Sequence, residues 1–363
     1  MKQMIKIAFL PLCAALLLAA CDRNRHTPDP DTQKVPLSFS ASSHNIPVKA
    51  STANSELSNY HKDFGVWGIA RHTTYQPFIL WEASPMVQVK AVEKKDPNTG
   101  EEIPTSEFVP VSGAFWVQGY AYSFIALAPY TGGLDALVDA VVTPSQNIAI
   151  SPDTFSFTFD MGTKYDESDY DFDLMGAAAI TPTVNVASHR GAQELNFHHL
   201  LAKINISVDL KDSKNGPSLG TVSKIRLLGV DTNSSYVIAY NATNELNVTS
   251  SAVVESQNEI IFSNDTESGT SGFQQCLNVV PQNISDYKLY IDFTLGTGAN
   301  QISFTDFFID IANATNQPTD KSYKCNEVYN WNITIGSKED ISFIVSVNPW
   351  GEQTVGGDEI DIF

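Results

Sequence analysis

The stretch Tyr287-Lys288-Leu289-Tyr290-Ile291-Asp292-Phe293-Thr294-Leu295 carries an apolar or aromatic side chain at every second position. Because successive side chains of a β-strand point to opposite faces, this period of two predicts a strand with one face in a core. The same alternation recurs on both sides of it, at Leu37–Ala41, Phe155–Phe159, Ile204–Leu210, Tyr329–Ile335 and Ile341–Val347. Many short strands separated by turn residues are typical of β-sandwiches, so the sequence predicts an all-β protein.

The organisation of the chain follows from these strands and from the breaks between them. A length of 363 residues fits two domains better than one. A Pro-, Ser- and Gly-containing stretch from Thr181 to Gln193 predicts a boundary, with β-sandwich domains at 35–188 and 189–363. Within the first domain, Lys90 to Glu107 is expected to form an exposed hairpin or loop, and a short helix is expected near Leu134 to Val142.

The N-terminal residues resemble an export signal. Lys2 and Lys6 precede a short apolar run that closes on Leu-Ala-Ala-Cys, so residues 1–20 are expected to be a lipoprotein signal peptide and Cys21 the lipidated residue. An ordinary signal or a membrane-spanning helix are the alternatives, but the apolar run is too short for a bilayer of about 30 Å. Residues 21–34 are interpreted as an extended tether to the outer membrane, with the protein exposed at the cell surface.

Composition excludes several classes of function. The chain carries 41 acidic and 22 basic residues, a net charge of −19, and no basic stripe, so nucleic acid is not an expected partner. No P-loop, nucleophile elbow, zinc-protease or dinucleotide motif occurs, so we expect neither a cofactor nor an enzyme.

Three groups of residues with potential chemistry are ambiguous. Cys276 and Cys325 either form a disulfide or remain two free buried thiols, and neither has metal-ligand neighbours. The acidic segment from Asp166 to Asp173 lacks the glycine and glutamate of an EF-hand loop, which favours a solvated loop over a calcium site. His198 and His199 are adjacent on a predicted strand, so one is expected to pack inward and the other to face solvent.

Several segments, taken together and in order, resemble the fimbrillin family of Bacteroidales, the subunits of type V pili. The resemblance covers nearly the whole mature chain. The segments are Phe64-Gly65-Val66-Trp67-Gly68, Asp173-Leu174-Met175-Gly176-Ala177, Leu195-Asn196-Phe197-His198-His199-Leu200-Leu201-Ala202-Lys203-Ile204, Tyr329-Asn330-Trp331-Asn332-Ile333-Thr334-Ile335 and Val347-Asn348-Pro349-Trp350-Gly351-Glu352.

The resemblance implies two tandem transthyretin-like Greek-key β-sandwich domains and assembly with other fimbrial subunits by donor-strand exchange. In this route a protease removes the first strand, and an extended strand from another subunit fills the groove. The strand to be displaced corresponds to about Val35–Ser43, whose apolar face is Leu37, Phe39 and Ala41.

The sequence departs from the family at the processing site. Where many relatives carry arginine, this chain has Lys49 followed by Ala50. Either the protease accepts lysine, or the chain stays uncut and serves as a lipid-attached anchor or accessory subunit. The candidate donor strand is the C-terminal segment with alternating Ile360 and Ile362, which has an equal claim to be the last strand of its own domain.

A second hypothesis comes from the class of binding modules. A monomeric surface lipoprotein could capture host or bacterial glycans or proteins through exposed aromatic residues such as Trp67, Trp81 and Trp116. Stacking on sugars requires these side chains to lie outside the core, which the sequence does not decide.

Overall fold

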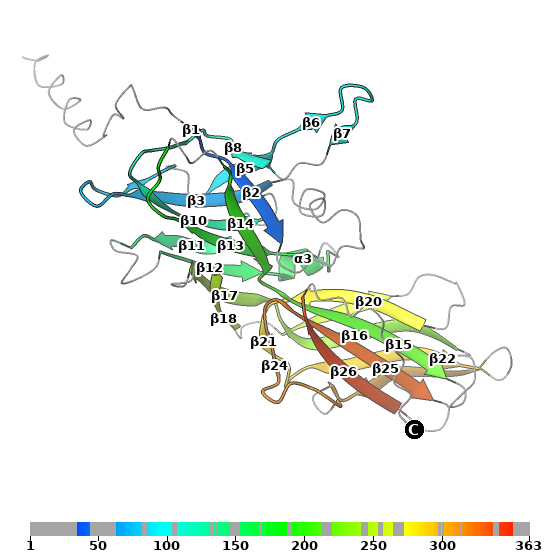
Figure 1. Ribbon diagram of the computed structural model, residues 1–363. Helices are drawn as coiled ribbons and strands as arrows, with labels where there is room; N and C mark the ends of the chain where they lie inside the picture. Colours follow the sequence, from blue (N-terminus) through cyan, green and yellow to red (C-terminus); the bar gives the residue numbers. More distant parts are fainter. Residues whose placement is uncertain are drawn as a thin grey trace, which may run out of the picture.

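The computed structural model describes residues 35–43, 63–81, 86–103, 107–130, 134, 137–145, 153–166, 169–170, 172–186, 191–211, 220–240, 246–252, 257–263, 272–296, 299, 301–311, 314–336 and 341–350. Figure 1 shows two bodies of β-structure joined at one end, with the C-terminal body at the lower right. The all-β prediction is confirmed. Within the described residues, no helix has the length and hydrophobicity that crossing a bilayer requires.

The N-terminal body is built on one large sheet. Its strands lie in the order β10 (Ala121–Ala128), β13 (Met175–Thr181), β14 (Gln193–His199), β2 (Phe39–Ser43), β8 (Glu107–Pro110), β5 (Val87–Ala91), β3 (Asp63–Arg71) and β4 (Phe78–Ile79). Because β10 also pairs with β3, the described strands other than β4 close into a barrel. Its interior is filled by apolar side chains, among which Phe64, Phe124 and Phe197 are fully buried. A short pair, β1 (Val35–Pro36) with β9 (Phe115–Trp116), adjoins this barrel.

A second sheet covers part of the barrel's outer surface. Its described strands are β11 (Leu137–Thr143), β12 (Thr154–Asp160), β17 (Asn233–Tyr240) and β18 (Leu246–Ala252). Trp67 and Ile125 on the outside of the barrel share a buried cluster with Phe157 and Tyr236 of this sheet. The strands β3 and β10 are therefore apolar on both faces, which explains the continuous burial of β10 from Tyr122 to Ala128.

The short helix expected near Leu134 to Val142 is wrong, because Leu137–Thr143 form the strand β11. The segment contains the β-branched residues Val138, Val141 and Val142, which favour strands, and β12 supplies a partner for its backbone. A bulge between Val138 and Val141, with Asp139 at φ 52°, interrupts the alternation that would have indicated a strand. The described helix α3 (Gly162–Asp166) is a single turn after β12.

The C-terminal body is a sandwich of two sheets. One sheet is β20 (Gly272–Val279), β15 (Ala202–Lys211), β25 (Glu327–Gly336) and β26 (Ile341–Pro349); the other is β19 (Gln257–Ser263), β16 (Gly220–Asp231), β22 (Lys288–Leu295) and β23 (Ile302–Ile309). A small pair, β21 (Gln282–Asn283) with β24 (Ser322–Tyr323), lies beside them. The core between the sheets includes Ile206, Ile291 and Trp331, as the alternation in the sequence predicted.

The chain does not pass from one body to the other at a single boundary, as the predicted division at 188/189 assumed. That boundary assigns β14 to the C-terminal domain, whereas β14 pairs with β13 and β2 in the barrel. The chain then enters the sandwich through β15 and β16, and returns to the N-terminal body with β17 and β18. Sequence composition marks loops but not strand partners, so it does not reveal this return.

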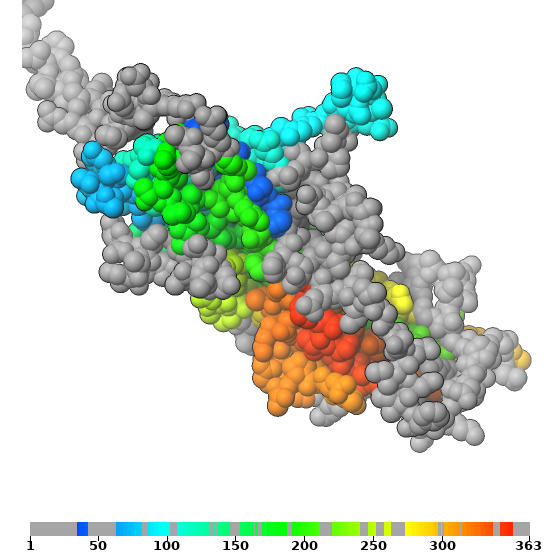
Figure 2. Space-filling view, viewed as in Figure 1, coloured from blue at the N-terminus to red at the C-terminus, as the bar shows by residue number. Residues whose placement is uncertain are grey.

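The insertion between Lys90 and Glu107 forms the exposed hairpin that was predicted. Its described strands are β6 (Lys94–Lys95) and β7 (Glu102–Ile103), which pair around a turn that contains Gly100 at φ 74°. Figures 1 and 2 show this cyan hairpin standing away from the barrel.

Candidate functional site

The first strand of the barrel, β2, lies between two strands that come from distant parts of the chain (Figure 1). It runs parallel to β14, with Phe39 opposite Gln193 and Ser43 opposite Phe197, and antiparallel to β8. Parallel neighbours cannot be joined by a tight turn, so β2 reaches this position independently of the hairpins around it. Its removal would open the ring and leave β14 and β8 as new edges.

The inward face of this first segment consists of the three residues named from the sequence, Phe39 and Ala41 on β2 and Leu37 two residues before it. Leu37, Phe39 and Ala41 are 2%, 0% and 8% exposed, and all belong to the barrel core. The ring of Phe39 makes edge-to-face contacts with Phe64 and Phe124, with centroids 6.3 and 5.3 Å apart. The strand thus contributes its side chains to the centre of the barrel and not to its rim.

The backbone of β2 is held more extensively by one neighbour than by the other. Five residue pairs join it to β14, whereas two join it to β8. Outside the strand, Leu37 N–H donates to the Ala114 carbonyl and Gln193 N–H donates to the Ser38 carbonyl, at 2.9 and 2.8 Å. The Ser42 hydroxyl on the outward face donates to Asn196 Oδ1 at 2.6 Å. These contacts all hold β2 at its position between β14 and β8, which we call the β2 seat.

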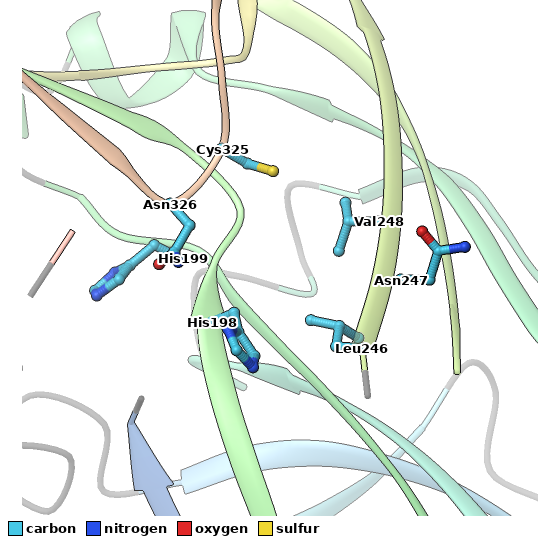
Figure 3. Close-up of a pocket in the computed structure, with 7 residues that line it drawn as sticks. All are labelled: His198, His199, Leu246, Asn247, Val248, Cys325 and Asn326. Atoms are coloured by element: carbon cyan, nitrogen blue, oxygen red, sulfur yellow. The ribbon is translucent and has the colours of Figure 1, made fainter. Parts of the chain in front are cut away.

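A second feature lies where the two bodies meet. A cavity of about 300 Å³ is lined by His198, His199, Leu246, Asn247, Val248, Cys325 and Asn326 (Figure 3). These residues come from β14, from β18 and from the turn before β25. Figure 3 shows the rings of both histidines pointing away from Cys325. Burial, together with the negative charge of Glu327, raises the pKa of the Cys325 thiol, so the thiolate needed of a nucleophile is disfavoured.

His199 is the buried member of the histidine pair and is 3% exposed, whereas His198 is half-buried. Its Nδ1 lies 2.7 Å from the Asp173 carboxylate, and its ring stacks on Trp350 with centroids 3.9 Å apart. The Lys203 ammonium lies 5.8 Å from the Trp350 ring centroid. His199 Nε2 and Asp173 Oδ1 are buried without a hydrogen-bond partner among the described residues. The stack joins β14 of the barrel to the residue that follows β26 of the sandwich.

Three of the segments that carried the family resemblance meet at this junction. Asp173, His199 and Trp350 belong to the segments Asp-Leu-Met-Gly-Ala, Leu-Asn-Phe-His-His-Leu-Leu-Ala-Lys and Val-Asn-Pro-Trp-Gly-Glu. These residues lie far apart in the sequence, and no local pattern indicates the contacts between them.

One contact of the acidic segment from Asp166 to Asp173 reaches His199 of β14. Asp173 is turned toward His199, and its side chain is 19% exposed. Among the described residues, no group of three His, Cys, Asp or Glu side chains is placed to hold a metal ion.

The two remaining cysteines are free thiols in the structure, so the disulfide alternative is wrong. Cys276 lies on β20 opposite Asn205 of β15, and Cys325 lies in the turn that lines the cavity between the bodies. The two thiols therefore lie in different parts of the structure, and the spacing of the cysteines in the sequence does not indicate this separation.

The aromatic residues of the glycan hypothesis lie in the core. Trp67, Trp81 and Trp116 are 4%, 7% and 1% exposed, so a platform for sugars built from these three side chains is wrong. Trp67 lies on β3, which is buried on both faces, Trp116 lies on β9, and Trp81 follows β4. The other named site residues, Cys21, Lys49, Ala50, Ile360 and Ile362, lie outside the described residues.

The fold and the position of β2 define a class of protein: an all-β protein with a barrel whose wall includes a strand inserted between β14 and β8. The family model described as fimbrillin-like matches residues 81–350. The chain belongs to the fimbrillin-like family, a family of fimbrial structural and adhesion proteins and not of enzymes.

Solved structures provide more distant likenesses. A putative cell adhesion protein from Bacteroides uniformis is 16% identical over 87% of this chain and 99% of its own, with a TM-score of 0.48. A fimbrial protein from Bacteroides vulgatus is 15% identical over 88% and 100%, with a TM-score of 0.48. A fimbrial assembly protein from Parabacteroides distasonis is 11% identical over 87% and 100%, with a TM-score of 0.39. No curated protein matches the sequence.

Proposed function

We propose that this chain is a structural and adhesive fimbrial subunit, exported as a lipoprotein and assembled by donor-strand exchange after removal of its first strand. The observation that carries the proposal is the position of β2, which fills one gap in a barrel whose other walls are joined to each other. A strand from another subunit would restore both the missing backbone pairs and the missing core side chains.

Release of β2 requires a cut in the chain between β2 and β3. Lys49-Ala50 lies in that interval, in a polar stretch that suits protease access. After cleavage, β2 would be held only by its non-covalent contacts. Its departure would expose Phe64, Phe124 and the edges of β14 and β8, so an empty seat is unfavourable and a replacement strand is strongly favoured.

The proposed donor is the C-terminal segment that contains Ile360 and Ile362. These two residues are spaced by two, as are Phe39 and Ala41, so both pairs present their side chains on one face of a strand. The segment follows Trp350 in the sequence, and Trp350 itself stacks on His199 of β14. In a polymer, the segment of one subunit would reach the barrel of the next.

The lipid on Cys21 is a transport handle in this proposal. Cleavage at Lys49 would discard Cys21 together with β2, so the anchor would be temporary in a stalk subunit. A chain that stays uncut would keep both the lipid and its own first strand and would act as an anchor or accessory subunit in the outer membrane.

The proposal is tested by strand exchange in solution. The chain is cut with a lysine-specific protease, and a fluorescent peptide of residues 351–363 is added while its anisotropy is followed. We expect slow, saturable binding to the cut protein and none to the uncut protein, because β2 leaves its seat only when it is detached.

Peptide variants show whether the apolar face sets the register. Ile360→Asp and Ile362→Asp should abolish binding, because each would place a charge in the barrel core. Asp361→Asn, on the opposite face, is the matched control and should bind as the unmodified peptide does. A cut protein that ignores all of these peptides would refute the assignment of the donor, and sequencing of the subunit N-terminus in purified filaments would refute cleavage if it returned acylated Cys21.

A further inference from the structure

An aromatic cluster is exposed at the end of the barrel away from the C-terminal sandwich. It consists of His72 and Tyr75, from the connection between β3 and β4, and Phe78, the first residue of β4, all packed around Tyr120. The ring centroid of His72 lies 4.7 Å from that of Tyr75 and 4.9 Å from that of Tyr120, and the ring centroid of Phe78 lies 5.4 Å from that of Tyr120. In Figures 1 and 2 the segment between β3 and β4 is the blue projection at the left end of the molecule.

The outer members of this aromatic cluster face solvent. Tyr75 is 48% exposed, Phe78 is 40% exposed and the neighbouring Ile79 is 47% exposed, whereas Tyr120 beneath them is 3% exposed. Buried aromatic rings need no function beyond packing, but rings that remain in water next to each other leave apolar surface uncovered. The cluster therefore has the exposure that Trp67, Trp81 and Trp116 lack.

The segment that carries the cluster contains no charged residue. Residues 72–80, His-Thr-Thr-Tyr-Gln-Pro-Phe-Ile-Leu, include no Asp, Glu, Lys or Arg, although the whole chain has a net charge of −19. The Thr74 N–H donates to His72 Nδ1 at 3.0 Å, which holds the imidazole against the backbone of the segment. What remains exposed are aromatic faces, hydroxyls and an amide.

The charged residue that precedes this segment in the sequence is turned inward. Arg71, the last residue of β3, forms a buried ion pair with Asp153 and donates to the Ser123 hydroxyl at 2.7 Å and to the Ser145 carbonyl at 3.0 Å. This network fixes the strand from which the aromatic segment begins. It also keeps the charge of Arg71 away from the surface.

The cluster is held in place from below. Gly119 has φ 83°, and a Cβ atom there would lie 3.3 Å from His72 Nε2, so a residue with a side chain would be strained and would crowd the imidazole. At the other end of the segment, Leu80 N–H donates to the Gly68 carbonyl at 2.9 Å. Rings fixed before a ligand arrives lose little freedom on binding, which is the property of a preorganised site.

We propose that the aromatic cluster of His72, Tyr75, Phe78 and Tyr120 binds a neutral saccharide. The C–H groups of a pyranose ring carry partial positive charge and pack on the electron-rich faces of aromatic rings. Its hydroxyls find partners in Thr73, Thr74 and Gln76, and no charged group has to lose its water. Acidic glycans are disfavoured because the protein itself is strongly negative.

A protein partner fits these observations less well. Specific protein interfaces cover about 800 Å² on each partner and are enriched in arginine as well as tyrosine. Here the exposed apolar side chains of the segment are Tyr75, Phe78 and Ile79, and its one arginine neighbour is buried. The saccharide site goes beyond the proposed assembly function, because it concerns a surface of the uncut monomer that β2 does not form.

The experiment uses the uncut full chain on an array of oligosaccharides ending in galactose, mannose, N-acetylglucosamine or N-acetylgalactosamine, with their sialylated counterparts printed beside them. Tyr75→Ala and Phe78→Ala remove the platform. Phe308→Ala is the matched control, because Phe308 is an aromatic residue that is 50% exposed on the C-terminal sandwich. Circular dichroism verifies that each variant is folded.

We expect at least one neutral glycan to bind, with a loss of about tenfold or more in affinity for Tyr75→Ala and Phe78→Ala and a change below about twofold for Phe308→Ala. Gly119→Ala, which moves His72 without removing a ring, should also weaken binding. Absence of binding to every neutral glycan, preference for the sialylated set, or equal losses in Phe308→Ala would overturn the proposal. So would an effect of Tyr75→Ala on association with another protein subunit and not on glycans. Strand exchange in the cut protein is measured separately and can succeed or fail independently.

Discussion

Truncation of one side chain on the first strand tests how β2 is held. Phe39 is fully buried and contacts Phe64 and Phe124 edge to face. Replacing a buried phenylalanine by alanine costs about 3–5 kcal/mol, since apolar burial is lost and a cavity remains. We expect Phe39→Ala to reduce the stability of the β2 seat by this amount. At about 1.4 kcal/mol per tenfold, the population of molecules with β2 displaced rises roughly a hundredfold to a few thousandfold.

Hydrogen–deuterium exchange with mass spectrometry measures this opening directly. The peptides that cover β2 and β14 should exchange faster in Phe39→Ala, because the amides between them are protected only while β2 is seated. Chemical unfolding followed by tryptophan fluorescence gives the loss of stability of the barrel, which contains Trp81 and Trp116.

Two controls separate this effect from general destabilisation. Ser40→Ala changes the same strand on its outward face and should alter stability by no more than about 0.5 kcal/mol. Phe343→Ala removes a phenylalanine from the core of the C-terminal sandwich and should not accelerate exchange in β2. If Phe39→Ala and Ser40→Ala gave the same exchange in β2, the inward face would not be what holds the strand, and the reasoning for strand exchange would fail.

Three further predictions concern the ends and the interior of the barrel. Asp153→Asn leaves Arg71 buried without its anionic partner, so unfolding experiments should show a loss of about 3–5 kcal/mol, and the double variant Arg71→Met/Asp153→Leu should recover part of it. Trp350→Ala removes the stack on His199 and should lower the midpoint of thermal unfolding by the equivalent of about 1–2 kcal/mol. Trp350→Phe should retain part of the contact, so identical midpoints for the two variants would contradict a stacking role. Burial raises the pKa of Tyr122 to about 12, so its phenol stays protonated in the folded state at pH values where the unfolded chain has lost that proton. The contribution of Tyr122 to the free energy of unfolding should therefore be fully present below about pH 10 and be lost as the pH rises from there toward 12, by about 1.4 kcal/mol per pH unit for each such tyrosine. Denaturant titrations at several pH values should show a less steep decline for Tyr122→Phe.

The sequence by itself determined which segments are strands and which of their faces are buried. The alternation at Phe155–Phe159, Ile204–Leu210 and Tyr329–Ile335 is sufficient for this, because a side-chain period of two fixes one face of a strand to the core. The inward face of β2 was readable for the same reason. The edge strand β11 was not, because its bulge at Asp139 breaks the period and its partner β12 supplies the stabilisation.

Only the tertiary structure decided which strands are neighbours. The position of β2 between β14 and β8, the return of β17 and β18 to the N-terminal body, and the meeting of Asp173, His199 and Trp350 all join residues far apart in the chain. Local patterns record burial, since burial depends on side-chain polarity at each position. They do not record pairing, because backbone hydrogen bonds are the same for every partner and the choice among partners is made by packing of the whole molecule. Trp67, Trp81 and Trp116 lie outside the alternating stretches, so only tertiary packing decided that they are buried, whereas Tyr75 and Phe78 are exposed.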